Sequence, residues 1–158
     1  MSCCEEFPRH IALPRGCFDD VAALFKSLHI ECQVEDKRFS GTPIEVSFTG
    51  TLRKEQHAAF EALIGHDQGV LAAATAFGKT VVAASLIAAR AVNTLVVVHR
   101  KQLLDQWIAQ LSTFLEGDDL AIGYMGGGKR KPGGCIDVAL MQTLNRKGVV
   151  DDCVAEYG

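Results

Sequence analysis

The amino-acid sequence predicts an α/β fold in which a parallel sheet is covered by helices on both faces. Short apolar runs alternate along the chain with helical runs, and one of these junctions ends in Gly-Lys-Thr. Strands that are apolar throughout are typical of sheets buried on both faces, because half-exposed strands alternate with polar residues. The loops at the carboxyl ends of such strands form the ligand sites of these folds. We therefore expect functional residues there.

Residues 1–48 are expected to form a small β-α-β module. Residues 10–13 have the character of a short strand, residues 18–28 that of an amphipathic helix, and residues 30–35 that of a second strand. A charged, turn-rich stretch follows these elements. We place a domain boundary within residues 40–50 for this reason.

The second expected domain, residues 49–158, shows helices and strands in alternation. Helices are expected at residues 53–64, 79–90 and 101–115, and strands at residues 69–74, 94–98, 120–124 and 136–141. This order predicts a parallel sheet. Residues 126–134 are rich in Gly, Lys and Arg, so a flexible and locally basic loop is expected there. Residues 149–155 have a helical or loop-like character.

The segment 73–80, AATAFGKT, is expected to bind phosphate groups because it lies between an apolar run and a helical run. A helix N-terminus offers unpaired backbone N–H groups and the positive end of the helix dipole. Gly78 would let this backbone approach a polyphosphate. Lys79 would place an ammonium between the β and γ phosphates, and Thr80 would bind Mg²⁺. Because Ala73 stands where a strict P-loop has Gly, an ordinary strand-to-helix connection stays an alternative.

Composition limits the classes of function. With 48% apolar and 22% charged residues the chain resembles soluble globular proteins, and its net charge of −3 offers no general cationic field for nucleic acid. Six cysteines lack metal-ligand spacing, which predicts neither zinc nor disulfides and favours a reduced, cytoplasmic protein. The Cys3-Cys4 pair is given no role. No apolar run approaches the ~20 residues of a membrane span, so no membrane association is expected.

Several segments together resemble superfamily 2 helicases and translocases, most of all the XPB-like branch. They are LRKEQ at residues 52–56, AATAFGKT at 73–80, LVVVHRKQLLDQW at 95–107, GGG at 126–128 and DVALMQTL at 137–144. Their order is that of the first RecA-like motor domain of the family. The resemblance covers roughly residues 50–158 and implies a P-loop, RecA-like parallel sheet that is incomplete in this chain.

The resemblance implies a site that binds ATP with Mg²⁺. The matching positions are Arg53, Gln56, Thr75, Ala76, Phe77, Gly78, Lys79 and Thr80. Gln56 matches the residue that recognises adenine, and a side-chain amide can both donate to and accept from the adenine edge. A solvated Gln on a helix surface is the alternative. Lys79 and Thr80 match the residues that take part in catalysis, Thr80 as the Mg²⁺ ligand, while Ala76 stands where a Gly is usual and stiffens the loop.

The resemblance also implies contacts with nucleic acid. Arg100 follows an expected strand, where a guanidinium can pair with a phosphate in a bidentate manner. Gln142 and Thr143 match polar residues that touch the backbone of the nucleic acid, and Lys129 and Arg130 add charge in the Gly-flanked loop. Solvated basic residues and an ordinary helix start are the alternatives. Trp107 is expected in the core. The expected partner is DNA, single-stranded or duplex, and the motifs do not separate DNA from RNA.

Motors of this family also need an acidic motif that orients Mg²⁺ and activates water, and a second RecA-like domain. The 158 residues contain neither, so the chain resembles the ATP-binding N-terminal portion of an ATP-dependent DNA helicase or translocase. The family hydrolyses ATP, but whether this chain does so stays open. We expect that catalysis needs a C-terminal motor half or a partner chain. The alternatives are a nucleotide- or nucleic-acid-binding module without catalysis and, with less support, a small P-loop kinase.

Overall fold

The computed structural model describes residues 5–13, 15–33 and 39–158, which belong to two compact units, Met1–Lys37 and Arg38–Gly158. Residues 39–48 therefore lie in the larger unit. Ile44 donates its backbone N–H to the Ala91 carbonyl, and an antiparallel bridge joins Pro43 to Val92. These non-local contacts tie the segment to the larger unit, although its sequence was expected to belong with the N-terminal module.

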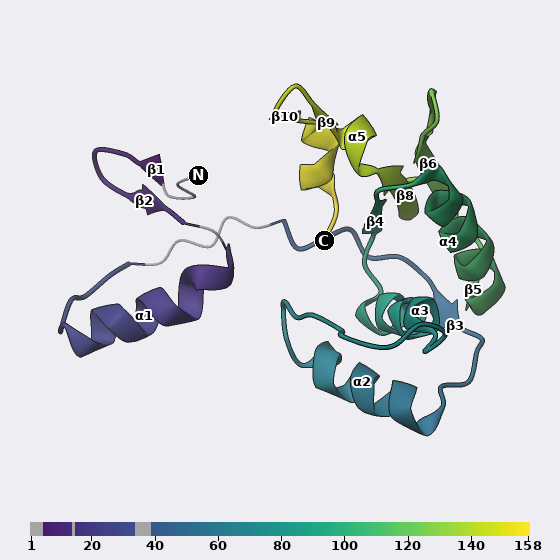
Figure 1. Ribbon diagram of the computed structural model, residues 1–158, viewed down its shortest axis with the longest axis horizontal. Coiled ribbons are helices and arrows are strands. Elements are labelled where there is room, and N and C mark those ends of the chain that lie inside the picture. The colour runs from purple at the N-terminus through teal and green to yellow at the C-terminus, as the bar shows by residue number, and fades with distance from the viewer. Residues whose placement is uncertain (1–4, 14, 34–38) are drawn as a thin grey trace. The chain divides into compact units, whose positions relative to one another are not determined.

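The smaller unit is a hairpin followed by a helix (Figure 1). Strand β1 (Glu5–Glu6) pairs antiparallel with β2 (Ile11–Ala12), and a 3₁₀ helix, η1 (Arg15–Cys17), leads into α1 (Phe18–Ser27). The expected β-α-β order is not found: residues 30–33 have no regular secondary structure, and residues 34–35 lie outside the described residues. The nearby β1 supplies β2 with a partner across a short turn, which costs less loop-closure entropy than pairing across a helix.

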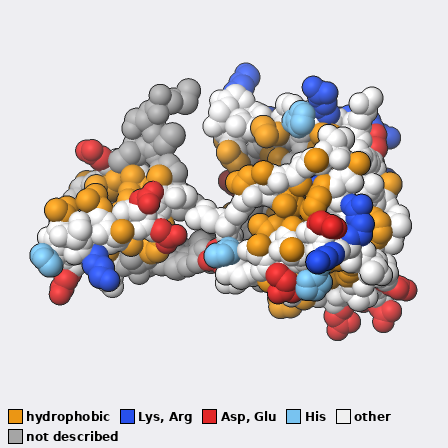
Figure 2. Space-filling model, turned by 60° about the horizontal axis from the view of Figure 1, so that its bottom comes forward, with side chains coloured by type: hydrophobic (Ala, Val, Ile, Leu, Met, Phe, Trp, Pro, Cys, Tyr) orange, Lys and Arg blue, Asp and Glu red, His pale blue; other side chains and the backbone are white. Residues whose placement is uncertain are grey.

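Apolar side chains lie on the surface of the smaller unit (Figure 2). Helix α1 has no buried residue, and Phe18, Leu24 and Leu28 are 52%, 53% and 56% exposed. A unit of this length has too little chain to enclose a core. Its amphipathic pattern is nevertheless the one that the sequence predicts for residues 18–28.

The larger unit is built on a sheet with the order β4-β8-β6-β7. Strand β4 (Thr94–Val98) pairs parallel with β8 (Ile136–Leu140), which pairs parallel with β6 (Ile122–Gly126). The edge strand β7 (Lys129–Lys131) runs antiparallel to β6. The predicted parallel sheet is thus confirmed, and the three parallel strands end at the same edge (Figure 1).

Of the helices beside the sheet, the second and third share its core, and the first packs against the second. They are α2 (Lys54–Ile64), α3 (Lys79–Arg90) and α4 (Lys101–Phe114), as the sequence predicts to within one residue. The buried cluster contains Ala84, Ile87, Val98, Leu104, Leu111, Leu115, Ile136 and Val138, and Trp107 packs against it as expected. Burial of these apolar side chains stabilises the layer of α3 and α4 on the sheet. In the described part of the chain, no helix combines the length and apolar character that a membrane crossing requires.

Residues 69–74 do not form the strand that the sequence predicts. They have no regular secondary structure, and Val70 is 91% exposed. The apolar run GVLAAA consists half of Ala, which is depleted in strands, and a strand also needs a hydrogen-bonding neighbour. The strand prediction for this segment is therefore wrong for this structure.

The Gly-rich basic segment forms a hairpin rather than the expected flexible loop. Gly126 pairs with Lys129, and between them Gly127 and Gly128 have φ angles of 63° and 78°. Two successive residues with positive φ make the two-residue turn whose twist suits a hairpin, and Gly adopts this conformation without steric cost. Lys129 and Lys131 therefore lie on a paired strand.

Short elements complete the unit. Strand β3 (Ser47–Phe48) pairs with β5 (Leu115–Glu116), and β9 (Asn145–Arg146) pairs with β10 (Val149–Val150). Helix α5 (Met141–Leu144) follows β8, and a 3₁₀ helix, η2 (Asp152–Glu156), follows β10. The helical or loop-like character expected of residues 149–155 is thus found in η2, while Val149 and Val150 form a short strand.

A buried carboxyl group anchors residues 152–158 to the sheet. Asp137 in β8 is fully buried and accepts hydrogen bonds from the Gly133 N–H (2.7 Å), the Gly134 N–H (2.9 Å) and the Tyr157 hydroxyl (2.7 Å). A buried polar group that is fully hydrogen-bonded avoids the cost of an unpaired one. Burial, together with the hydrogen bond to Asp137, raises the pKa of Tyr157.

Tyr157→Phe is expected to lower the free energy of unfolding by about 1.5–3 kcal/mol, the usual worth of a hydrogen bond to a charged group. Because the pKa of Tyr157 is raised from 10.0 on folding, its contribution is present below about pH 10 and is lost as the pH rises further. Urea unfolding of the wild type and Y157F at pH 7 and pH 11 measures both effects. Tyr124→Phe, at the other tyrosine of the chain, is the control. Equal stability of Y157F and wild type at pH 7 would contradict the anchor.

Candidate nucleotide and nucleic-acid sites

Helix α3 begins at a left-handed glycine, although the loop before it does not follow the strand that the phosphate-binding prediction assumed. Gly78, its N-cap, has φ 88°, and Lys79 and Thr80 form the first turn. The first N–H groups of a helix have no partner inside the helix, so they are available to an anion. A Cβ at position 78 would collide with the side-chain nitrogen of Gln56. Gly78 is therefore required both by its φ angle and by the close approach of α2.

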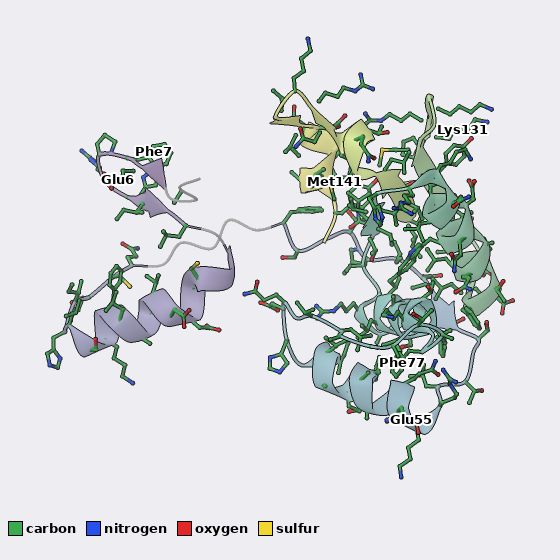
Figure 3. The ribbon with its side chains drawn as sticks, in the orientation of Figure 1. Glu6, Phe7, Glu55, Phe77, Lys131 and Met141 are labelled. Carbon is green, nitrogen blue, oxygen red and sulfur yellow. The ribbon has the colours of Figure 1, made fainter. Side chains whose placement is uncertain are left out.

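Gln56 and Arg53 hold the loop against α2. Gln56 is 4% exposed; its Oε1 accepts a hydrogen bond from the Arg53 backbone N–H (2.9 Å), and its Nε2 donates to the Phe77 carbonyl (2.8 Å). The Arg53 guanidinium donates to the same carbonyl. Figure 3 shows Phe77 over the start of α2, close to Glu55. These bonds use one donor and one acceptor of the Gln56 amide, and its role in adenine recognition stays a prediction.

Lys79 lies on the surface and folds back over the loop. Its Nζ donates to the Ala74 carbonyl at 2.9 Å, and its side chain is exposed. One exposed hydrogen bond of this kind contributes little, so the ammonium can exchange it for a phosphate oxygen. Thr80 is half-buried in the first turn, and Thr75 is exposed in the loop. These residues fit a nucleotide polyphosphate with its Mg²⁺: a lysine, a hydroxyl and open backbone N–H groups.

Ala76 has the left-handed conformation, with φ 64°. This position is the one at which the resemblance led us to expect Gly. An L-residue in this region costs roughly 1–2 kcal/mol because its Cβ approaches the backbone. The stiffening inferred from the sequence therefore takes a specific form, a strained residue in the middle of the loop.

A second group of candidate residues gathers at the carboxyl edge of the sheet. Arg100 follows β4 as the exposed N-cap of α4, and Gln142 and Thr143 follow β8 in α5. The Gln142 Nε2 donates to the His99 carbonyl at 3.1 Å, which joins the two strand ends. Gln142 thus has a structural bond that the sequence did not indicate, and its amide still has a free oxygen that can accept a hydrogen bond.

Strands β6 and β7 with the turn Gly127–Gly128 form a hairpin, called the Gly hairpin below. Its turn lies at the same edge because β6 runs parallel to β8. Lys129 is exposed and lines a shallow pocket of about 210 Å³, together with Lys101, Leu104, Asp105, Ile108, Tyr124, Gly126 and Gly127. Lys101 and Asp105 form an exposed ion pair with Nζ 2.7 Å from Oδ2. Such an exposed pair contributes little and is readily rearranged. Lys101, like His99, was expected to assist Arg100, and the structure places it at this edge.

Arg130 has a different environment from Lys129. Its guanidinium forms two hydrogen bonds with the Asp151 carboxylate, at 2.6 Å and 3.0 Å. These bonds, with a further one from the Cys153 N–H, lower the pKa of Asp151 well below its ordinary value. Sequence patterns did not predict this pair, because the two residues lie 21 positions apart.

The described cysteines and acidic residues form no metal site, and Cys153 is not a reactive thiol. Cys17, Cys32, Cys135 and Cys153 are free thiols, and burial raises the pKa of Cys153 to about 11. A thiol with this pKa stays protonated at neutral pH and is a poor nucleophile. Among residues 5–13, 15–33 and 39–158, no three His, Cys, Asp or Glu side chains group in a way that could hold a metal ion. The Cys3-Cys4 pair lies outside the described residues.

Comparison with known proteins identifies the family. Residues 49–152 match the family described as "Type III restriction enzyme, res subunit". The chain belongs to this family. It is 30% identical over 113 residues to "DNA 3'-5' translocase XPB2" of Sulfurisphaera tokodaii (71% of this chain, 25% of that protein) and 38% identical over 72 residues to "Putative helicase 109L" of Invertebrate iridescent virus 3 (43% and 22%).

These relationships confirm the resemblance to superfamily 2 helicases. The chain spans about a quarter or less of the length of these two relatives. The family match covers α2, the loop 73–80, α3 and the whole sheet, and it begins after the N-terminal unit.

Ala76→Gly is expected to stabilise the protein, because relief of the left-handed strain outweighs the ~0.5–1 kcal/mol of chain entropy that Gly costs. The expected net gain is about 0.5–1 kcal/mol in urea unfolding. Ala89→Gly, at an exposed position inside α3, is the matched control and should lower stability by about 1 kcal/mol. Equal losses in A76G and A89G would show that Ala76 is not strained.

Proposed function

We propose that this chain binds ATP with Mg²⁺ at the loop 73–80 and a DNA strand at the carboxyl edge of its sheet, as the ATP-binding portion of an ATP-dependent helicase or translocase. The observation that carries the proposal is the start of α3 at left-handed Gly78, directly followed by Lys79 and Thr80. This geometry suits a polyphosphate. ATP hydrolysis would supply the free energy for movement along nucleic acid.

The proposed roles at the nucleotide site follow from position and chemistry. Backbone N–H groups at the start of α3 and the Lys79 ammonium would hold phosphate oxygens, and the Thr80 hydroxyl would bind Mg²⁺. Arg53, Gln56 and Phe77 would fix the loop relative to α2, since all three take part in its hydrogen bonds. Gln56 would in addition offer its second amide N–H and the free lone pair of its oxygen to the base.

The nucleic-acid part of the proposal rests on three chain segments at one edge. Arg100 would pair with a phosphate, Gln142 and Thr143 would contact the sugar-phosphate backbone, and Lys129 would add charge from the hairpin. A local patch of this kind compensates for the net charge of −3. DNA is proposed because one relative is named a DNA translocase.

The second candidate function is nucleotide or nucleic-acid binding without catalysis. Two acidic residues of the larger unit, Asp137 and Asp151, are engaged by Tyr157 and Arg130, which favours this alternative. Hydrolysis would then need an acidic motif and an arginine from another motor half or chain. ATP turnover by this chain that rises with single-stranded DNA would exclude the alternative.

Lys79→Ala is expected to weaken ATP–Mg binding by roughly ten- to hundredfold, because it removes a charge-assisted contact worth about 1.5–3 kcal/mol. Titration calorimetry measures the two affinities. Lys54→Ala, which removes an exposed lysine at the start of α2, should bind ATP like the wild type. Equal ATP affinity of K79A and K54A would rule out the phosphate-binding loop.

Arg100→Gln is expected to weaken binding of an oligo(dT) strand and to lower the slope of log K against log salt by about 0.7, the value for one lost phosphate contact on a single strand. Fluorescence anisotropy over a range of salt concentrations gives both quantities. Lys26→Gln removes one positive charge from the N-terminal unit and serves as the control. The same slope in R100Q and wild type would show that Arg100 does not contact phosphate.

A further inference from the structure

The Gly hairpin has two faces with different surroundings. In the antiparallel pair, Arg130 lies opposite Met125 and Lys129 lies opposite Gly126. Residues directly opposite each other share a face, and successive residues alternate. Met125 is fully buried in a cluster with Ala139 and Leu144, whereas Lys129 lines the pocket beside α4. Arg130 therefore points away from the face on which Lys129 is presented.

The partner of Arg130 is itself held in place. The Asp151 backbone N–H donates to the Leu144 carbonyl at 2.7 Å, and its carboxylate accepts from the Cys153 N–H at 3.1 Å. The Asp151 carbonyl accepts from the Val154 N–H at 3.1 Å. Leu144 belongs to α5, the helix that carries Gln142 and Thr143. Asp151 is thus a fixed point tied to the end of β8.

The hairpin needs such a fixed point. Strand β7 has three residues, all exposed, and among the described residues it pairs with β6 alone. The turn before it consists of glycines, which give little resistance to a change in direction. A bidentate Arg–carboxylate pair restricts both distance and orientation, which one-point contacts do not. Figure 3 shows Lys131 on the narrow arm formed by this hairpin, which extends beyond the sheet.

We propose that Arg130 and Asp151 form a clamp that fixes the direction of the Gly hairpin, so that Lys129 is presented to nucleic acid at the same edge as Arg100 and Gln142. Arg130 is then a positioning residue and not a phosphate contact. This inference rests on the proposed nucleic-acid function. It reassigns Arg130, whose place in a basic triplet would otherwise suggest direct contact.

Removing the charge of Asp151 distinguishes a phosphate contact by Arg130 from a clamp, because the two roles predict opposite changes in the affinity for nucleic acid. If Arg130 contacted phosphate, loss of the Asp151 charge would free Arg130 and tighten the binding of a polyanion. If the pair is a clamp, loss of the Asp151 charge frees the hairpin. Binding of nucleic acid must then also supply the free energy that orders the hairpin. We expect oligo(dT) affinity to fall by about two- to tenfold in Asp151→Asn, the range for immobilising one or two side chains.

Asp152→Asn is the matched control, because it removes the same charge from the exposed neighbour in η2. Asn at position 151 can still cap η2, so D151N keeps that local bond. Thermal unfolding by circular dichroism checks that both variants are folded. Binding of oligo(dT) by D151N that is as tight as that of D152N, or tighter, would overturn the clamp.

Two variants of Arg130 separate geometry from charge. Arg130→Lys keeps the charge but loses the bidentate fork, so we expect it to bind as weakly as Arg130→Gln, and both to keep the wild-type salt slope. Lys129→Gln should lower that slope by about 0.7. If R130K binds like the wild type, or if R130Q lowers the slope, Arg130 contacts phosphate and the clamp is wrong. If neither K129Q nor R100Q changes affinity, the proposed nucleic-acid surface fails, and the clamp with it.

Discussion

Parallel pairing of β4, β8 and β6 is the constraint on which the larger unit depends. Val98 is in register with Leu140, so the chain leaves both strands at the same level and places Arg100 and Gln142 two residues further on. The hydrogen bond from Gln142 to the His99 carbonyl is a direct result of this register. Because β6 runs the same way, the Gly turn reaches the same edge. A basic surface is thereby assembled from three distant parts of a chain with net negative charge.

Buried polar side chains also hold other segments of the chain against this sheet through hydrogen bonds. Asp137, the second residue of β8, is fully buried, yet three donors satisfy it, among them the hydroxyl of Tyr157. Buried Asn93 binds the Thr42 N–H through its oxygen and the Glu156 carbonyl through its nitrogen. Residues far apart in sequence, before and after the sheet, therefore meet beside β4. Leaving either buried group unpaired would cost more than the bonds themselves contribute.

Sequence patterns predicted those features that depend on neighbours along the chain. The helices α3 and α4 and the strands β4 and β8 all follow from local periodicity. The failures concern partners distant in sequence. Residues 69–74 are apolar but have no strand beside them, and residues 30–33 lie in a unit where β1 is the partner of β2. The contact between Arg130 and Asp151 could not be predicted from sequence patterns. Alternation along β7 shows to which face each side chain points only once the pairing of β7 is known.

The central claim is that the carboxyl edge of the sheet is a single nucleic-acid surface assembled from separate segments. Hydrogen–deuterium exchange of the 158-residue chain, with and without an excess of oligo(dT), tests this claim most directly. We expect reduced exchange in residues 99–103, 126–131 and 141–145 together, with no change in α1. Protection confined to α1 and the β1–β2 hairpin, or no protection at saturating oligonucleotide, would contradict the account.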